Sequence, residues 1–168
     1  MVAGLVWKLI CMNGPSCNLR TRFAQCAWQN SIPKTIWSLT VKKILILESD
    51  RRTAKKLADY LAANGYDVLT APNAVEGLQV ILDQSPDLII CEVWMPVGVG
   101  FSLAQRLRDL GLDNIPIIFM TNRKEKDLRE TARQMGAADF FEKPCAPETI
   151  LASIGKALFY RDAHQAGS

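Results

Sequence analysis

The stretch Asp87-Leu88-Ile89-Ile90-Cys91-Glu92-Val93-Trp94-Met95-Pro96 decides the fold. After its first residue the segment 87–91 is entirely apolar, and the acidic Glu92 ends the run. A short, continuous apolar run is typical of a parallel strand that is covered on both faces. We therefore predict a buried strand over residues 87–91, with Glu92 at its carboxyl end.

The same pattern recurs on both sides of this strand. Strands are predicted at 43–47, 66–70, 115–120 and 138–141, and the alternating run 66–70 indicates an edge strand. Segments with apolar residues at helical spacing follow the five strands, at 54–62, 74–82, 101–110, 124–135 and 150–158. Alternating strands and helices predict an α/β fold, a five-stranded parallel sheet with helices on both faces. The flavodoxin-like order 2-1-3-4-5 is a common strand order for a parallel sheet of five strands.

Polar residues follow four of the predicted strands. Because such folds place their site outside the carboxyl ends of the strands, these side chains are expected to meet. They are Glu48, Ser49, Glu92, Thr121 and Lys143. Asp50 is next in the chain, but it stands where a helix starts and is better suited to be its N-cap.

From about residue 42 to residue 160 the chain resembles the receiver domain of two-component response regulators, the CheY-like family. The resemblance rests on three motifs in the family's order, each at a strand end. They are the quoted stretch 87–96, Pro116-Ile117-Ile118-Phe119-Met120-Thr121, and Gly136-Ala137-Ala138-Asp139-Phe140-Phe141-Glu142-Lys143-Pro144.

The resemblance implies a role for each site position. In the family, an acidic pair and the Asp after the third strand hold Mg²⁺, and that Asp accepts a phosphoryl group from a kinase histidine. A hydroxyl and a lysine bind this group, and an aromatic residue then turns inward. Thr121 and Lys143 match the phosphate-sensing residues, and Phe140 matches the switch aromatic. Pro144 matches the proline that follows the lysine, often after a cis bond.

Two positions depart from the family pattern. The acidic pair is reduced to Glu48-Ser49, and the phosphoacceptor position holds Glu92 rather than Asp. Because Mg²⁺ demands near-ideal octahedral oxygen ligation, we expect Glu48 and Glu92 to bind it weakly or not at all, and we expect no other cofactor. The longer Glu92 also displaces the acceptor oxygen, and a misplacement of about 1 Å can slow a reaction on the order of 10²-fold.

The role of Glu92 has two interpretations. Its longer side chain reaches toward Lys143 and Thr121, so a direct Glu92–Lys143 ion pair would hold the domain in one state without kinase input. Alternatively, Glu92 is a solvated relic carboxylate that signals nothing. Trp94, two positions later, lies at the rim of the site and either blocks a phosphodonor or is an ordinary exposed aromatic.

We predict that the protein is not an enzyme. The leading hypothesis is a pseudo-receiver, a single-domain module that signals through protein contacts without normal aspartyl phosphorylation. The alternatives are a working phosphorelay receiver phosphorylated at the strand-3 acidic position and, more remotely, a small-molecule-binding enzyme on a flavodoxin-like fold. The absence of a dinucleotide-binding glycine motif, a P-loop and a nucleophile elbow argues against the last. The only histidine is His164, which argues against histidine chemistry.

The expected partner is a protein. It would bind the face made by the fourth helix (124–135, highly charged), the fifth strand (138–141) and the fifth helix (150–158), and a homodimer through this face is the second option. The net charge of +3 suggests neither a nucleic-acid nor a membrane partner. The five cysteines match no metal or redox motif, so we expect free thiols and a cytoplasmic location.

The first 41 residues differ from the rest in composition. They hold three of the four tryptophans and four basic residues, and no Asp or Glu. We predict that residues 1–41 form an extension that is disordered or weakly structured, or one that results from a start codon assigned too early. Residues 42–160 are the predicted receiver domain, and residues 161–168 are a predicted C-terminal tail.

Overall fold

The computed structural model describes residues 41–96, 98–125 and 127–166. The expectations for the N-terminal extension fall on residues 1–40, outside the described residues, apart from Val41. In the described part, no helix is both long enough and apolar enough to cross a membrane.

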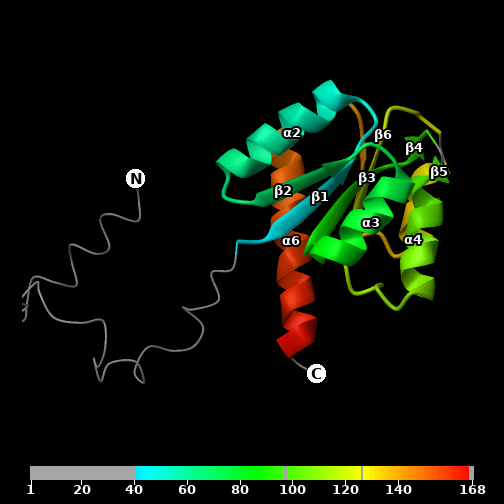
Figure 1. Ribbon diagram of the computed structural model, residues 1–168. Coiled ribbons are helices and arrows are strands. Elements are labelled where there is room, and N and C mark those ends of the chain that lie inside the picture. Colours follow the sequence, from blue (N-terminus) through cyan, green and yellow to red (C-terminus); the bar gives the residue numbers. More distant parts are fainter. Residues whose placement is uncertain (1–40, 97, 126, 167–168) are drawn as a thin grey trace, which may run out of the picture. The chain divides into compact units, whose positions relative to one another are not determined.

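A five-stranded parallel sheet forms the centre of the domain (Figure 1). Its strands are β1 (Lys43–Leu47), β2 (Asp67–Ala71), β3 (Leu88–Glu92), β6 (Ile117–Thr121) and β7 (Asp139–Glu142). They pair in the order β2-β1-β3-β6-β7, which confirms the predicted 2-1-3-4-5 order. All five residues of β3 are buried, as its apolar run predicts, and β2 is an edge strand.

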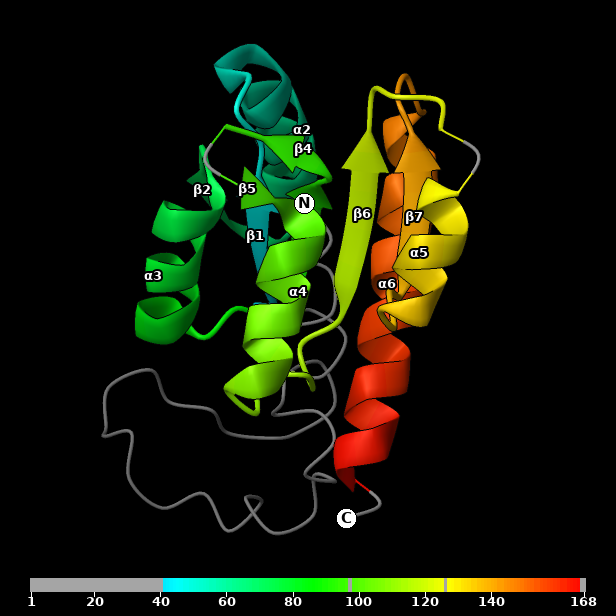
Figure 2. The same cartoon turned by 90° about the vertical axis from the view of Figure 1, so that its right-hand side faces the viewer.

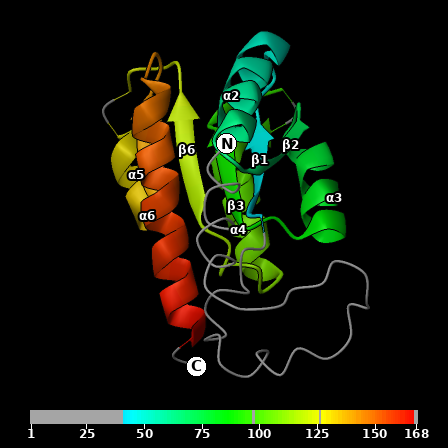
Figure 3. The same cartoon turned by 90° about the vertical axis from the view of Figure 1, so that its left-hand side faces the viewer.

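Helices cover both faces of the sheet. Figure 3 looks onto the face with α2 (Arg51–Ala63) and α6 (Pro147–Ala166). Figure 2 shows the opposite face, with α3 (Ala74–Gln84), α4 (Gly100–Asp109) and α5 (Leu128–Gln134). The apolar residues accordingly form two core clusters, one under each layer of helices.

Three elements differ from the sequence-based expectation. The helix predicted at 124–135 begins only at Leu128, the first residue of that segment to pack into the core. A short antiparallel hairpin, β4 (Trp94–Met95) with β5 (Gly98–Val99), lies where the sequence predicts only a loop. Residues 161–166, assigned to a tail by their polarity, continue helix α6.

Charged contacts between distant segments explain the length of α6. Arg161 Nη1 donates to the carbonyl oxygen of Asp87 at 2.7 Å and to its carboxylate at 2.8 Å. Lys42 Nζ donates to the Asp162 carboxylate at 3.0 Å. These contacts hold the polar end of α6 against the start of β1 and β3, and local sequence patterns cannot reveal them.

The strand register aligns the carboxyl ends of the strands. Leu47 of β1 lies beside Cys91 of β3, and Glu92 lies beside Met120 of β6. Thr121 in turn lies beside Glu142 of β7. The residues at and just after these positions therefore share one edge of the sheet.

Gly100, at the start of α4, packs against the strand that carries Glu92. A Cβ at position 100 would lie 2.6 Å from the Glu92 carbonyl oxygen and 2.8 Å from Cys91 Sγ. Because the nearest atom belongs to the backbone, we expect Gly100→Ala to lower the free energy of unfolding by about 1–3 kcal/mol in urea denaturation.

Gly155→Ala is the matched control, since a Cβ at this position in α6 meets nothing within 4 Å. Replacing a helical glycine by alanine in open space should raise stability by about 0.5–1 kcal/mol. Equal stability of the two variants would contradict the close packing at Gly100.

Candidate functional site

Two carboxylates and one ammonium meet at the carboxyl edge of the sheet. Glu48 follows β1 and is 8% exposed, and Glu92 ends β3 and is 4% exposed. Lys143 follows β7, and its Nζ donates a hydrogen bond to Oε2 of each glutamate. Figure 1 shows β1 and β3 ending at the same edge, and Figure 2 shows β7 ending beside β6. These three residues are called the Glu–Lys–Glu cluster below.

The cluster is largely withdrawn from water, so its charges depend on one another. Burial by itself would lower the pKa of Lys143, but the hydrogen bonds and charges of Glu48 and Glu92 outweigh burial, and the pKa is raised. The ammonium therefore stays charged and separates two carboxylates that would otherwise repel each other. The formal charge of the cluster is −1.

Neither residue that follows Glu48 adds a carboxylate to the cluster. Ser49 is exposed. Asp50 is the N-cap of α2, as predicted, and its carboxylate accepts from Arg52 N, Thr53 N and Thr53 Oγ1. The Thr53 hydroxyl is the main reason why the pKa of Asp50 is lowered. Asp50 N donates to Glu48 Oε1 at 3.0 Å, so the helix start also orients Glu48.

The donor set does not fit a magnesium site. In the described residues, no three or more His, Cys, Asp or Glu side chains group so that they could hold a metal ion. Glu48 and Glu92 are the only carboxylates of the cluster, and Lys143 bonds both of them. Mg²⁺ needs oxygen ligands at about 2.0–2.1 Å in octahedral geometry, which two carboxylates already bonded to an ammonium do not provide.

Thr121 bonds Lys143 through the backbone and Phe140 lies on β7, which ends just before Lys143, but neither side chain is part of the cluster. Thr121 is fully buried, and its Oγ1 accepts a hydrogen bond from Arg123 N at 3.1 Å. Phe140 is 4% exposed, and the Arg129 guanidinium lies 5.1 Å from its ring centroid. The hydroxyl therefore bonds the backbone of its own loop, and the aromatic ring lies inward.

An aromatic–cation contact joins the two loops next to the cluster. The Arg123 guanidinium lies 4.4 Å from the ring centroid of Trp94, within the range of a cation–π interaction. Trp94 is half-buried, and its Nε1 is buried without a hydrogen-bond acceptor among the described residues. The sequence identifies Trp94 as a residue at the rim, but nothing in the sequence pairs it with Arg123.

The cysteine next to Glu92 has no catalytic character. Cys91 is fully buried and its thiol donates to the Glu92 carbonyl oxygen at 3.3 Å. Burial, followed by the charges of Glu92 and Glu48, raises the pKa of Cys91 far above its ordinary value. Since the thiolate is the reactive form, Cys91 is a packing residue.

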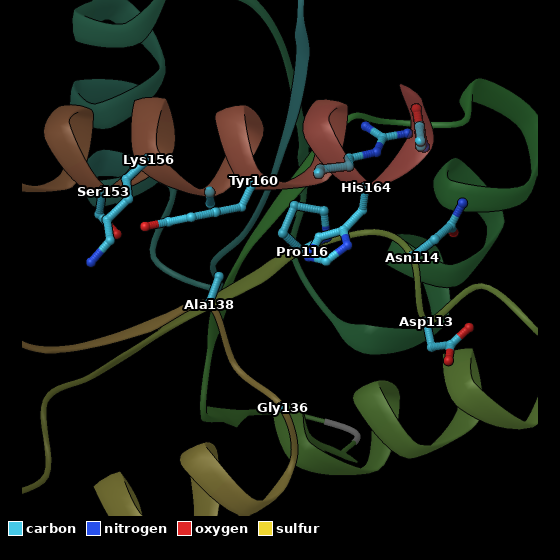
Figure 4. Close-up of a pocket in the computed structure, with 12 residues that line it drawn as sticks. Asp113, Asn114, Pro116, Gly136, Ala138, Ser153, Lys156, Tyr160 and His164 are labelled. Atoms are coloured by element: carbon cyan, nitrogen blue, oxygen red, sulfur yellow. The ribbon is translucent and has the colours of Figure 1, made fainter. Parts of the chain in front are cut away.

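Among the grooves of the described surface, two have similar volumes. One, of about 700 Å³, lies at the amino ends of β6 and β7 against α6, far along the strands from the cluster (Figure 4). Lys156 and Asp113 are among its lining residues, so its charge is mixed. The other, of about 650 Å³, includes Lys143 in its lining and lies between α2 and the start of α6.

The chain matches the model of the response regulator receiver domain over residues 44–155. The response regulator MprA of Mycobacterium sp. (strain KMS) is 34% identical over 125 residues, which are 74% of this chain and 54% of that protein. The chain thus spans about half the length of the curated relatives it matches.

Solved structures agree with this match. A CheY-like receiver domain protein from Methanospirillum hungatei JF-1 is 24% identical, with a TM-score of 0.70 over 74% of this chain and 99% of that one, and shows the fold alone. The BeF3-activated N-terminal receiver domain of Klebsiella pneumoniae RstA is 28% identical, with a TM-score of 0.65 over 70% of this chain and 98% of that one. The chain belongs to the response regulator receiver domain family of two-component signalling.

Proposed function

We propose that this receiver domain signals through protein contacts, without normal aspartyl phosphorylation and without catalysing a reaction itself. One observation carries the proposal. The phosphoacceptor position holds Glu92, whose carboxylate is hydrogen-bonded to Lys143, and the same ammonium bonds Glu48. The groups that would have to receive a phosphoryl group and its metal ion are already bonded to one another.

The chemistry of phosphoryl transfer supports this proposal. Such transfer depends almost wholly on in-line positioning and on neutralising the charge of the transferred group. Glu92 carries its carboxylate one methylene further than an aspartate would, and Ser49 supplies no charge to attract a metal ion. Both requirements are therefore weakened in the same site.

The phosphate-sensing half of the site favours an active-like resting state. In receiver domains the switch aromatic turns inward together with the hydroxyl of the fourth strand. Phe140 is 4% exposed and already lies inward, with the Arg129 guanidinium 5.1 Å from its ring centroid. We infer that Glu92, bonded to Lys143, takes the place of a phosphorylated aspartate and keeps the domain in this state.

The output surface in this proposal is the face made by α5, β7 and α6, which Figure 2 shows from the side of α5. Charged residues of α5 lie on it, among them the exposed ion pair Glu130–Arg133. On α6, Phe159 and Tyr160 are 70% and 55% exposed, and their rings contact each other edge to face. We propose a protein partner for this face, or a second copy of the chain.

The proposal includes a cytoplasmic location, which the free thiols expected from the sequence favour.

Restoring the missing acids should restore phosphorylation. We expect the double variant Ser49→Asp/Glu92→Asp, incubated with acetyl phosphate and Mg²⁺, to take up a phosphoryl group at least on the order of 10²-fold faster than wild type. The shorter side chain at position 92 and the second carboxylate at position 49 recreate the geometry and charge of the family site. Intact-protein mass spectrometry measures the uptake.

The two single variants are the controls, and we expect each to react more slowly than the double variant. If the double variant takes up phosphate no better than wild type, Ser49 and Glu92 do not account for the defect. Rapid uptake by wild type would favour a working phosphorelay receiver instead.

Removing the ammonium should destabilise the fold. Lys143→Met leaves two buried carboxylates without a cation, and we expect a loss of about 3–5 kcal/mol in the free energy of unfolding. Lys55→Met is the control, because Lys55 pairs with Asp59 on the exposed surface of α2 and should contribute less than about 1 kcal/mol.

The pH dependence of this loss follows from the raised pKa of Lys143. A raised lysine pKa contributes stability that is fully present below the ordinary value of 10.5 and is lost only as the pH rises through the folded-state value. The stability difference between wild type and Lys143→Met should therefore be the same at about pH 7 and about pH 9. A difference that disappears over this range would show that Lys143 is not held as a charged group.

A further inference from the structure

The groove between α2 and the start of α6 is the strongest unassigned feature of the described surface. It measures about 650 Å³, within the range of small-molecule sites. Figure 3 shows the two helices that border it, on the same face of the sheet. Its lining residues come from α2, the end of β6, and the β7–α6 connection, and include Lys56, Leu57, Tyr60, Met120, Cys145 and Ile150.

The floor of the groove is apolar. Leu57 and Ile150 are buried, and both belong to the core cluster beneath α2 and α6. Met120 contributes a thioether, which adapts readily to ligands of different shapes. Tyr60 adds a half-buried aromatic ring at the side. Such a floor favours a ring or a short hydrocarbon chain over a strongly hydrated ligand.

The charged side chains that line the groove are both lysines. Lys56 and Lys143 are its charged lining residues, and no acidic side chain lines it. Glu48 and Glu92 together outweigh the charge of Lys143, so Lys56 is the lining residue that supplies an available positive charge. Lys56 forms no ion pair with another described residue, whereas its neighbour Lys55 bonds Asp59 at 2.7 Å. An exposed, unpaired cation above an apolar floor is complementary to an amphipathic anion.

We propose that this groove binds a small amphipathic organic anion, a carboxylate or sulfonate attached to an aromatic ring or a short hydrocarbon chain. The apolar part lies on Leu57, Met120 and Ile150, and the acid group lies at Lys56. The inference goes beyond the proposed function, because binding here does not depend on whether Glu92 accepts a phosphoryl group.

The position of the groove links this ligand to the switch residues. Met120 and Asn122 line the groove and directly flank Thr121 in the chain, and the side chain of Lys143 forms part of its wall. An anion placed on Met120 therefore lies against the residue that directly precedes Thr121, in a groove that Lys143 also lines. The groove gives the domain a route for input that needs no phosphodonor.

Anilinonaphthalene sulfonate, a fluorescent aromatic anion, is a suitable probe for the full-length chain. We expect Lys56→Gln to weaken its binding about threefold to tenfold, because the variant removes the cation but keeps the floor. Lys55→Gln makes the same charge change one residue away and should bind the probe as wild type does. Neutral phenylnaphthylamine, which lacks the sulfonate, should bind wild type and Lys56→Gln equally.

Cys145 provides a second readout inside the groove. Burial raises the pKa of its half-buried thiol, so alkylation by iodoacetamide is slow enough to follow under mildly alkaline conditions. Bound probe should slow the alkylation of Cys145 several-fold, as measured on its peptide by mass spectrometry. At the same probe concentration, Lys56→Gln should show less protection.

Three outcomes would overturn the proposal. The first is equal probe binding by wild type and Lys56→Gln. The second is equal weakening by Lys55→Gln and Lys56→Gln, which would indicate adsorption to the general charge of α2. The third is binding without protection of Cys145, which would locate the probe elsewhere, such as the groove lined by Lys156 in Figure 4.

Discussion

The ammonium of Lys143 between Glu48 and Glu92 is the interaction on which the carboxyl edge of the sheet depends. It connects the ends of β1, β3 and β7 through side chains that are almost fully withdrawn from water. Two buried carboxylates in contact would be costly without a cation between them, and a buried lysine would be costly without an anion. Each charge is tolerated because the other two are present, so the three positions form one unit.

This unit also limits the chemistry of the site. In a phosphorylated receiver domain, a metal ion and a lysine share the negative charge of the acidic residues and the phosphoryl group. In this chain one acid is replaced by Ser49, and both glutamates that remain are bonded to the lysine. A metal ion or phosphoryl group that enters must compete with these bonds. A metal ion would also find one carboxylate fewer than in the family pattern.

The surroundings of the cluster are held by arginine–aromatic contacts. Arg123 covers the ring of Trp94, and Arg129 covers that of Phe140. Both arginines lie in or next to the connection between β6 and α5, so this connection is attached to the site loop on one side and to β7 on the other. The Thr121 hydroxyl, bonded to Arg123 N, completes the attachment.

The sequence by itself determined the order of the sheet, the residues at its carboxyl edge and the N-cap at Asp50, because hydrophobic periodicity and capping are local properties. It also identified Glu92 and Ser49 as departures, and it offered a Glu92–Lys143 ion pair as one of two interpretations of Glu92. Only the tertiary structure decided that Lys143 bonds Glu48 as well, that Arg123 covers Trp94, and that α5 begins at Leu128. It alone decided where the two grooves lie and how far α6 extends. These features depend on contacts between residues far apart in the chain, whose geometry local patterns do not encode.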